Sequence, residues 1–187
     1  MPKVLGLALL LVAALAASAS AATLLAADLA QLVRMSDFVV LAKAESRASR
    51  KQESSGLIVT DVKLRVQLPL KGTVKAGETL TATLLGGTIG DVGLHVPGEA
   101  HIPDDRGAIV FLRRTANGEL NVSGMGQGVL SITGQGNAAV VMPAAPDAAL
   151  VQPDDTGKLQ SAPQAVPSPQ PLATLLQRIR ELAAAAP

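Results

Sequence analysis

The sequence predicts an all-β domain, either a small barrel or a sandwich, with one helix before it and one after it. The first observation is a long stretch, Leu57 to Gly72, in which apolar and polar residues alternate. The second is a series of short apolar runs between Thr79 and Met142, separated by glycines and turn residues. Side chains of a strand point alternately to its two faces, and short, regularly interrupted runs are typical of sandwiches and small barrels.

Composition argues against several classes of partner and site. The 187-residue chain has 16 Lys and Arg against 15 Asp and Glu, and removing residues 1–22 deletes Lys3 and no acid, leaving 15 against 15. A neutral chain is a poor match for nucleic acid or an anionic membrane, which attract concentrated Lys and Arg. Two Phe with no Tyr or Trp leave few side chains for base stacking. The lack of Cys excludes disulfides, thiolate metal sites, a Cys nucleophile and a lipidated Cys.

Residues 1–22 have the three-part pattern of a secretory signal peptide. Lys3 gives the positive start, Val4–Ala17 is an unbroken apolar run, and Ala19–Ala21 offers small residues for cleavage. The run is shorter than the roughly 20 residues that cross a bilayer, so a retained N-terminal anchor is the weaker alternative. The sequence therefore predicts a secreted or periplasmic protein with no integral membrane segment after cleavage.

Residues 23–142 are expected to form the β domain, which begins with a short helix. From Thr23 to Met35 the apolar residues recur three and four apart, which places them on one helical face. Phe38–Ala42 then begins the first strand. Its polar continuation, Lys43–Ser55, predicts either a hairpin arm or a mobile loop.

The alternating stretch predicts a long strand with one face on the core. Val62, Leu64 and Val66 belong to its apolar face, and Lys63 and Arg65 belong to the opposite face. We therefore expect the first three side chains to be buried and the two cations to be in solvent.

A second strand, Ala108–Leu112, is apolar on both of its faces. Such a run is typical of a strand that is covered on both sides, so this is expected to be the most buried strand of the domain. Ile109 and Phe111 are accordingly placed in the core.

Proline and glycine mark where strands end or bend. Pro69 cannot donate a ladder hydrogen bond, so Leu70–Gly72 is expected to be the exit turn of the long strand. Gly86–Gly87 predicts a bend or a close approach of two backbones. Asn117–Gly118 is a strong hairpin turn, and Gly134–Asn137 is a further turn rather than a dinucleotide-binding loop, because no helix pattern follows it.

The chain changes character after Met142. Residues 143–171 are rich in Pro, Ala and small polar residues without an apolar period, which predicts a disordered linker. Residues 172–187 recover a helical period, with an apolar stripe that runs from Leu172 to Leu182. This C-terminal amphipathic helix is expected either to pack on the β domain, to bind a partner, or to fray as a tail.

One loop region holds the residue types of a metal site. His95, Glu99, His101, Asp104 and Asp105 lie within eleven positions, and imidazoles with carboxylates suit a divalent cation. Their spacing matches no helical metal motif, and polar residues are common in loops. We therefore assign no metal residue, and keep a metal-dependent enzyme or hydrolase that uses His95 and His101 as the alternative.

Nucleophilic catalysis has even less support in the sequence. Neither Ser123 nor Ser131 has glycines two residues to each side, so the nucleophile elbow of many hydrolases is missing. We predict that the protein is not an enzyme and that it has no catalytic or cofactor-binding residues and no cofactor.

Several short segments resemble landmarks of an uncharacterised group of exported bacterial β-rich proteins. They are Ser36–Ala42, Ile58–Thr60, Leu70–Gly72, Leu85–Gly90, Val96–Glu99, Val110–Leu112 and Gly124–Gly128. The resemblance covers roughly Leu24 to Thr133 and leaves out the linker and the terminal helix. Members of the group are often encoded near secreted metallopeptidases, which implies an accessory or inhibitory role.

The opening strand also resembles the netrin-like, OB-type barrel of tissue metalloprotease inhibitors. That resemblance implies an OB-like barrel here. Those inhibitors act through an N-terminal Cys, which this chain lacks, so their mechanism is not implied. The sequence as a whole predicts an exported, non-catalytic binding or accessory module that contacts another envelope or secreted protein, with a peptidase as one candidate.

Overall fold

The computed structural model describes residues 22–143, 148–163 and 169–185. The predicted signal peptide, residues 1–22, lies outside the described residues except for Ala22. Two short 3-10 helices are labelled η1 and η2. In chain order the elements are β1 (Ala22–Leu25), α2 (Leu29–Arg34), β2 (Phe38–Lys51), β3 (Ile58–Lys71), β4 (Thr79–Leu85), β5 (Gly87–Ile89), β6 (Val92–Leu94), β7 (Gly107–Arg114), β8 (Leu120–Val122), η1 (Met125–Gly128), β9 (Val129–Thr133), η2 (Gly136–Ala138), β10 (Val140–Pro143), β11 (Ala148–Pro153), β12 (Leu159–Ser161), β13 (Gln170–Pro171) and α3 (Leu172–Ala185).

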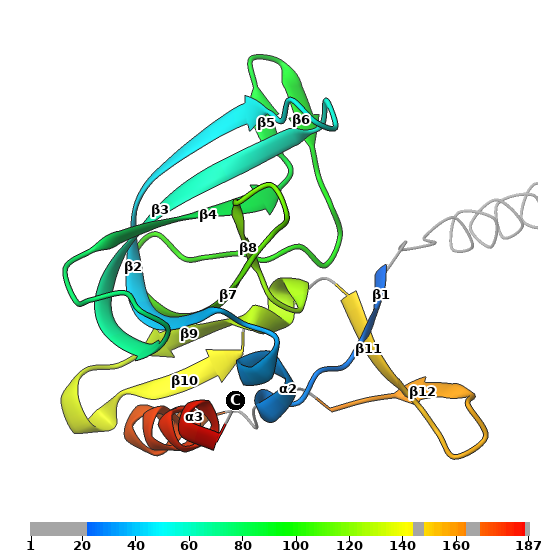
Figure 1. Cartoon of the computed structure of the whole chain (residues 1–187). Helices are drawn as coiled ribbons and strands as arrows, with labels where there is room; N and C mark the ends of the chain where they lie inside the picture. The colour runs from blue at the N-terminus through cyan, green and yellow to red at the C-terminus, as the bar shows by residue number, and fades with distance from the viewer. Residues whose placement is uncertain (1–21, 144–147, 164–168, 186–187) are drawn as a thin grey trace, which may run out of the picture.

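Eight strands form one sheet in the order β13-β10-β9-β7-β2-β3-β4-β8. β8 pairs with β7 as well as with β4, so β7, β2, β3, β4 and β8 close into a ring (Figure 1). The β4–β8 contact is parallel and joins Ala82 to Leu120, whereas the other four contacts of the ring are antiparallel. The predicted all-β class is confirmed, with α2 after the first strand and α3 after the last strand described.

β7 separates two hydrophobic cores, because both of its faces are apolar. Ala108, Val110 and Leu112 belong to a first core that draws on all five ring strands. Ile109 and Phe111 belong to a second core, to which α2 and α3 contribute. Both side chains are fully buried, as predicted.

The predicted long strand is present as β3, and its central alternation is confirmed. Val62, Leu64 and Val66 are buried in the first core, and Lys63 and Arg65 are exposed. β2 and β4 pair with β3 on its two sides, so its backbone is hydrogen-bonded along both edges.

β3 continues through Pro69 to Lys71, so the chain leaves the strand only at Gly72, the last residue of the exit turn expected at Leu70–Gly72. Its pairing with β2 shifts register between Leu41 and Ala42, so Gln67 has no opposite residue among the described strands. This is the geometry of a β-bulge, which tolerates a nearby proline and re-aims the following side chains. Leu68 therefore packs against the second core instead of continuing the face of the first.

The N-terminal helix is shorter than the predicted segment, residues 23–35. Its first residues form β1, and α2 begins only after Asp28. Asp28 accepts a hydrogen bond from the backbone N–H of Gln31, whose side chain accepts one from the N–H of Asp28, each at 2.7 Å. This capping box fixes the start of the helix. Leu32 and Val33 then enter the second core.

The polar continuation of the first strand belongs to the hairpin formed by β2 and β3, and a hairpin was one of its two predicted forms. β2 extends to Lys51 and turns into β3, because its polar side chains face solvent while its backbone pairs with β3. The register runs as far as the pair Lys51–Ile58 at the tip.

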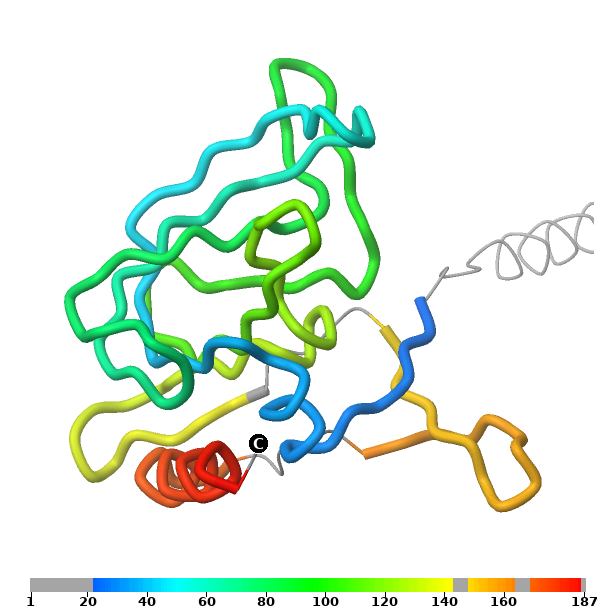
Figure 2. The backbone as a smooth tube through the Cα atoms, viewed as in Figure 1, coloured from blue at the N-terminus to red at the C-terminus, as the bar shows by residue number. Residues whose placement is uncertain are grey.

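The prediction of a disordered linker over residues 143–171 is wrong wherever the structure describes this stretch. β11 pairs in parallel with β1 and antiparallel with β12, and this three-stranded sheet, the arm, projects from the ring (Figures 1 and 2). Composition could not reveal the pairing, because the partner strand β1 lies at the other end of the chain. Residues 144–147 and 164–168 of the predicted linker lie outside the described residues.

The predicted C-terminal helix is present as α3, and it packs on the β domain. Leu175 and Ile179 are buried in the second core, beside α2 (Figure 2). The first of the three expected arrangements is therefore the observed one. Of the helices in the described ranges, none is long and apolar enough to cross a membrane.

Candidate functional site

Two hairpins project together at one end of the molecule, the upper end in Figure 1. They are the β2–β3 hairpin with its turn, residues 52–57, and the β5–β6 hairpin, Gly87–Leu94. With the nearby β7–β8 turn, residues 115–119, we name this region the hairpin end. Three large apolar side chains of the hairpin end are exposed, namely Leu57, Ile89 and Val92, and Val92 is the most exposed of them at 64%. Leu85, the last residue of β4 just before the β5–β6 hairpin, is also exposed.

Glycine allows the β5–β6 hairpin to lie directly on the β2–β3 hairpin. A Cβ atom on Gly87 would lie 2.2 Å from Thr60 Oγ1 and 2.5 Å from Ser49 Oγ, so only glycine fits. The N–H of Gly86 donates to the carbonyl of Ile58 at 2.9 Å, and Thr60 Oγ1 donates to the carbonyl of Gly86 at 2.7 Å. The close backbone approach expected at Gly86–Gly87 is confirmed.

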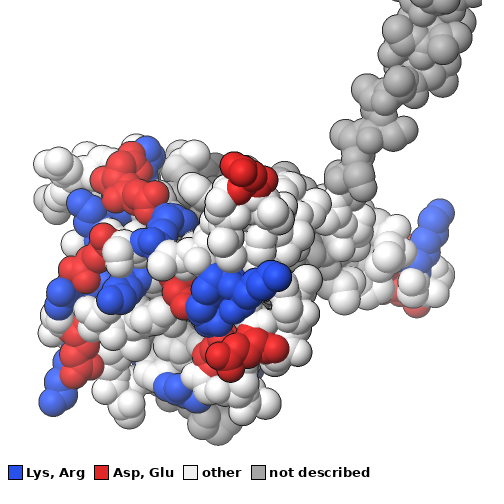
Figure 3. Space-filling view, turned by 90° about the horizontal axis from the view of Figure 1, so that it is seen from above, with Lys and Arg blue, Asp and Glu red and all other residues white. Residues whose placement is uncertain are grey.

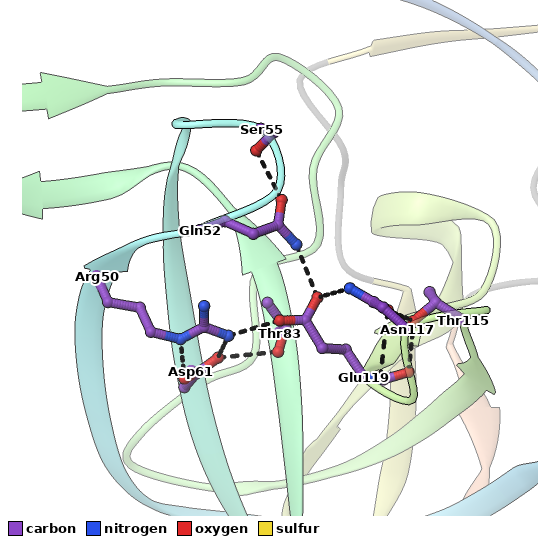
Figure 4. A network of polar contacts seen from close by, with 8 residues as sticks. All are labelled: Arg50, Gln52, Ser55, Asp61, Thr83, Thr115, Asn117 and Glu119. Carbon is purple, nitrogen blue, oxygen red and sulfur yellow. Dashed lines mark hydrogen bonds and ion pairs between the residues drawn. The ribbon is translucent and has the colours of Figure 1, made fainter.

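A polar network connects the β2–β3 hairpin to β4 and to the β7–β8 turn (Figure 4). Arg50 Nε donates to Asp61 Oδ2 at 2.6 Å, and Arg50 Nη2 donates to Glu119 Oε1 at 2.7 Å. Thr83 Oγ1 donates to Asp61 Oδ1 at 2.8 Å. Gln52 Nε2 donates to Glu119 Oε2 at 2.7 Å, so Glu119 is held both by β2, through Arg50, and by the β2–β3 turn, through Gln52.

Arg50 stabilises the ionised form of both carboxylates. Burial alone would raise the pKa of Asp61, but the hydrogen bonds from Arg50 and Thr83 outweigh it and lower this pKa below its ordinary value. The hydrogen bond from Arg50 lowers the pKa of Glu119, with further help from Asn117 and Gln52. Both acids are therefore charged and fully engaged at neutral pH.

The network borders an open polar groove of about 450 Å³ between the β2–β3 tip and the β7–β8 turn. Lys51, Gln52 and Glu53 line one side, and Asn117 and Glu119 line the other. Because its carboxylates are already paired with Arg50, the network is suited to fixing the two loops rather than to proton transfer.

The two histidines of the predicted alternative lie close to the same end. His95, Glu99 and His101 line one pocket of about 350 Å³, together with Gly86 and Gly87. The Glu99 carboxylate accepts hydrogen bonds from the N–H of Leu85 at 3.0 Å and of Ala100 at 2.8 Å. Both imidazoles therefore line the same pocket, and both oxygens of the nearby Glu99 carboxylate already accept hydrogen bonds from backbone N–H groups.

The remaining acids that the sequence analysis considered as metal ligands are paired with arginines. Asp104 Oδ1 lies 2.6 Å from Arg47 Nε, and Asp105 Oδ2 lies 2.7 Å from Arg106 Nη2. Across residues 22–143, 148–163 and 169–185, no group of three or more His, Asp or Glu side chains could hold a metal ion.

Ser123, one of the two serines considered as nucleophiles, is buried and bonded to another serine. Ser36 Oγ donates to the carbonyl of Leu32 at 2.7 Å, and the hydroxyl oxygens of Ser36 and Ser123 are hydrogen-bonded to each other at 2.8 Å. This pair ties the end of α2 to the segment after β8, which is a structural role.

Charges of both signs are interspersed over the face that includes the hairpin end (Figure 3). Acidic and basic side chains alternate there with uncharged surface, and several of these charges form ion pairs, such as those of Arg47 with Asp104 and of Arg50 with Asp61. Such a surface favours neither a polyanion nor a polycation as its ligand.

No family model matches this chain, and neither a curated protein nor a solved structure matches it. The chain's own residues therefore have to indicate its function.

The network was not predicted from the sequence. Asp61 lies among Lys63 and Arg65 on the polar face of the long strand, and Arg50 lies in a short basic run, so neither stands out. Glu119 is far from both in the sequence and follows an ordinary hairpin turn. Only the closure of the ring, which brings the β7–β8 turn against the β2–β3 hairpin, reveals their connection.

Proposed function

We propose that the protein is an exported, non-catalytic binding module whose hairpin end contacts another envelope or secreted protein. The observation that carries this proposal is that Leu57, Ile89 and Val92 are exposed. They lie on the two hairpins that project together at one end of the molecule (Figure 1). Exposed apolar side chains scattered singly are ordinary, whereas a group at one projecting end is typical of a protein-binding surface.

The hairpin end is held rigid, which favours binding. The Arg50 network fixes the β2–β3 tip against the β7–β8 turn, and Gly86–Gly87 fixes the β5–β6 hairpin on the first. A surface that is already ordered loses less conformational entropy when a partner binds.

An OB-like barrel is the finer description that we propose for the ring. The ring has five strands and is closed by β8, which fits a small barrel of this kind. Barrels of the OB type bind ligands with their loops and with one strand face, and the hairpin end consists of such loops. Secreted peptidases are the partner class that the resemblance of the sequence adds.

The decisive experiment is capture of a partner from the native envelope by the tagged exported protein. Val92→Asp and Ile89→Asp place charges on the β5–β6 hairpin, and Leu159→Asp is the matched control on the arm, where Leu159 is 55% exposed. We expect the wild type and the control to retain one specific protein and the two hairpin variants to lose it, with equal melting temperatures. Retention by the hairpin variants, or no specific capture by the wild type, contradicts the proposal.

The alternative function is a metal-dependent enzyme or hydrolase centred on His95 and His101, which share a pocket. Replacing both with alanine separates the two functions. Loss of a measured hydrolytic activity in the double variant would favour the enzyme, whereas capture that survives both this change and a chelator supports the binding module.

A further inference from the structure

An open groove lies between the arm and α2, on a different part of the surface from the hairpin end. It has a volume of about 550 Å³, and most of its lining is apolar. The apolar lining comprises Leu25, Ala26, Ala27, Met35, Val151 and Pro153. Leu25 is 67% exposed although it lies in a strand, so its apolar surface is available to a ligand.

Two side chains of α2 bring hydrogen-bond donors to this apolar groove. Gln31 and Arg34 are three residues apart in the helix and therefore lie on one side of it. The Oε1 atom of Gln31 is used by the capping box, which leaves its Nε2 donors free of contacts with the described residues. Arg34 makes no hydrogen bond or ion pair within the described part of the chain, and it is the one charged side chain among the described lining residues.

The groove has a fixed frame. Gln127 is buried, and it accepts a hydrogen bond from the N–H of Ala27 at 2.9 Å and donates to the carbonyl of Leu25 at 3.0 Å. The N–H of Ala26 donates to the carbonyl of Val151 at 2.8 Å, which holds the two arm strands together at the groove. The segment between β1 and α2 is thus anchored on both sides.

An apolar groove with donors and a cation selects an apolar group that carries a carboxylate. A guanidinium binds a carboxylate through two parallel hydrogen bonds, and the Gln31 amide offers a further donor on the same side of the helix. We propose that this groove binds the C-terminal end of a partner polypeptide, with an apolar last side chain against Leu25 and Met35 and the terminal carboxylate at Arg34.

A peptide suits the groove better than a fatty acid of similar charge. The site is open along Leu25, so an acyl chain would keep much of its surface in water. An extended peptide buries alternate side chains on one face and leaves its other face in solvent, as an open groove requires.

Fluorescence anisotropy with two labelled peptide pools tests the proposal on the full mature chain. Both pools consist of short random peptides that end in leucine, one with a free C-terminal carboxylate and the other with a C-terminal amide. We expect the free-acid pool to bind about fivefold more tightly, which corresponds to roughly 1 kcal/mol, the upper end for an ion pair with an exposed arginine such as Arg34.

Variants identify the groups that cause this preference. Arg34→Gln should make the acid and the amide bind alike, because it removes the charge while keeping a polar side chain. Leu25→Asp should weaken both pools, because it places an anion on the apolar wall. Arg178→Gln on α3 is the matched control, since Arg178 is an exposed arginine outside the groove, and it should leave the preference unchanged.

Three results would overturn the proposal. They are equal binding of the two pools to the wild type, no binding of the free-acid pool, and displacement of that pool by dodecanoate at equal concentration. Circular dichroism melts of Arg34→Gln and Leu25→Asp confirm that the variants are folded, so that a loss of binding is read at the groove. Both side chains are exposed, and we expect both melts to match the wild type.

Discussion

Arg50 is shared by two carboxylates that come from different parts of the ring. Asp61 lies on the neighbouring strand β3, and Glu119 lies in the turn that leads into β8. The three side chains are partly buried, so the interaction is stronger than a fully exposed ion pair and weaker than a dry one. Arg50 therefore joins the β2–β3 hairpin to the strand that closes the ring.

Replacing Arg50 with methionine keeps the apolar stem and removes the charge. We expect Arg50→Met to lower the free energy of unfolding by about 1–2 kcal/mol, because Asp61 and Glu119 are then left unpaired and close to each other. Arg106→Met removes a more exposed ion pair, the one with the neighbouring Asp105, and should change the free energy of unfolding by about 0.5 kcal/mol or less. Urea melts at neutral pH measure both values, and equal effects would contradict the role given to Arg50.

The network also predicts how stability depends on pH. In the folded protein the pKa of Glu119 lies below its ordinary value of 4.5, chiefly because of the hydrogen bond from Arg50. The ionised carboxylate therefore contributes its full stabilisation above pH 4.5, and this stabilisation is lost as the pH falls through the pKa that Glu119 has in the folded protein. The stability advantage of the wild type over Glu119→Gln should therefore be constant near neutral pH and shrink as the pH falls below 4.5.

The same comparison made with Arg50→Met in both proteins is the control for the pH prediction. Without the guanidinium the main cause of the lowered pKa is gone, so the advantage should become nearly independent of pH. Urea melts over a pH series provide the data. A pH-dependent advantage of the same size in the absence of Arg50 would contradict the assignment.

At the level of the elements, α3 covers one of the two cores. Ile179→Ala should cost about 2–4 kcal/mol, because Ile179 is fully buried and a cavity would remain. Arg180→Ala, at the next residue and exposed, should change the free energy of unfolding by no more than about 0.5 kcal/mol, and urea melts measure both values.

Removing residues 170–187, which include α3, should lower the melting temperature and increase the binding of a dye to apolar surface. Unchanged melting after the deletion would show that the second core does not need the helix.

How far each element could be predicted depends on how local its cause is. The alternation of Val62 to Val66 and the stripe of α3 are set by neighbouring residues, and both were predicted. The bulge at Gln67 depends on the register with β2, so the sequence did not predict that Leu68 would change to the other face. Likewise β11 looks like a linker in composition and becomes a strand only because β1 pairs with it. The Arg50 network has the same kind of cause, since three distant segments must first meet.

At the scale of the whole molecule, the proposed export predicts where the mature chain begins. Cleavage after the small residues Ala19–Ala21 should give an N-terminus between Ser20 and Thr23. N-terminal sequencing of the natively exported protein measures this directly. Such a product keeps most or all of β1, which begins at Ala22, and retention of Met1 would contradict the prediction.

The parallel pairing of β1 with β11 has a consequence for the order of folding. A chain that emerges from a translocation channel N-terminus first presents β1 before every other strand described, yet Ala22 finds its partner only when Ala148 has emerged. The ring strands β2, β3 and β4 are neighbours along the chain and can pair while synthesis or transport continues. If the chain is exported in this way, β1 stays unpaired through that whole interval, and the order in which segments emerge sets when the three-stranded sheet can form.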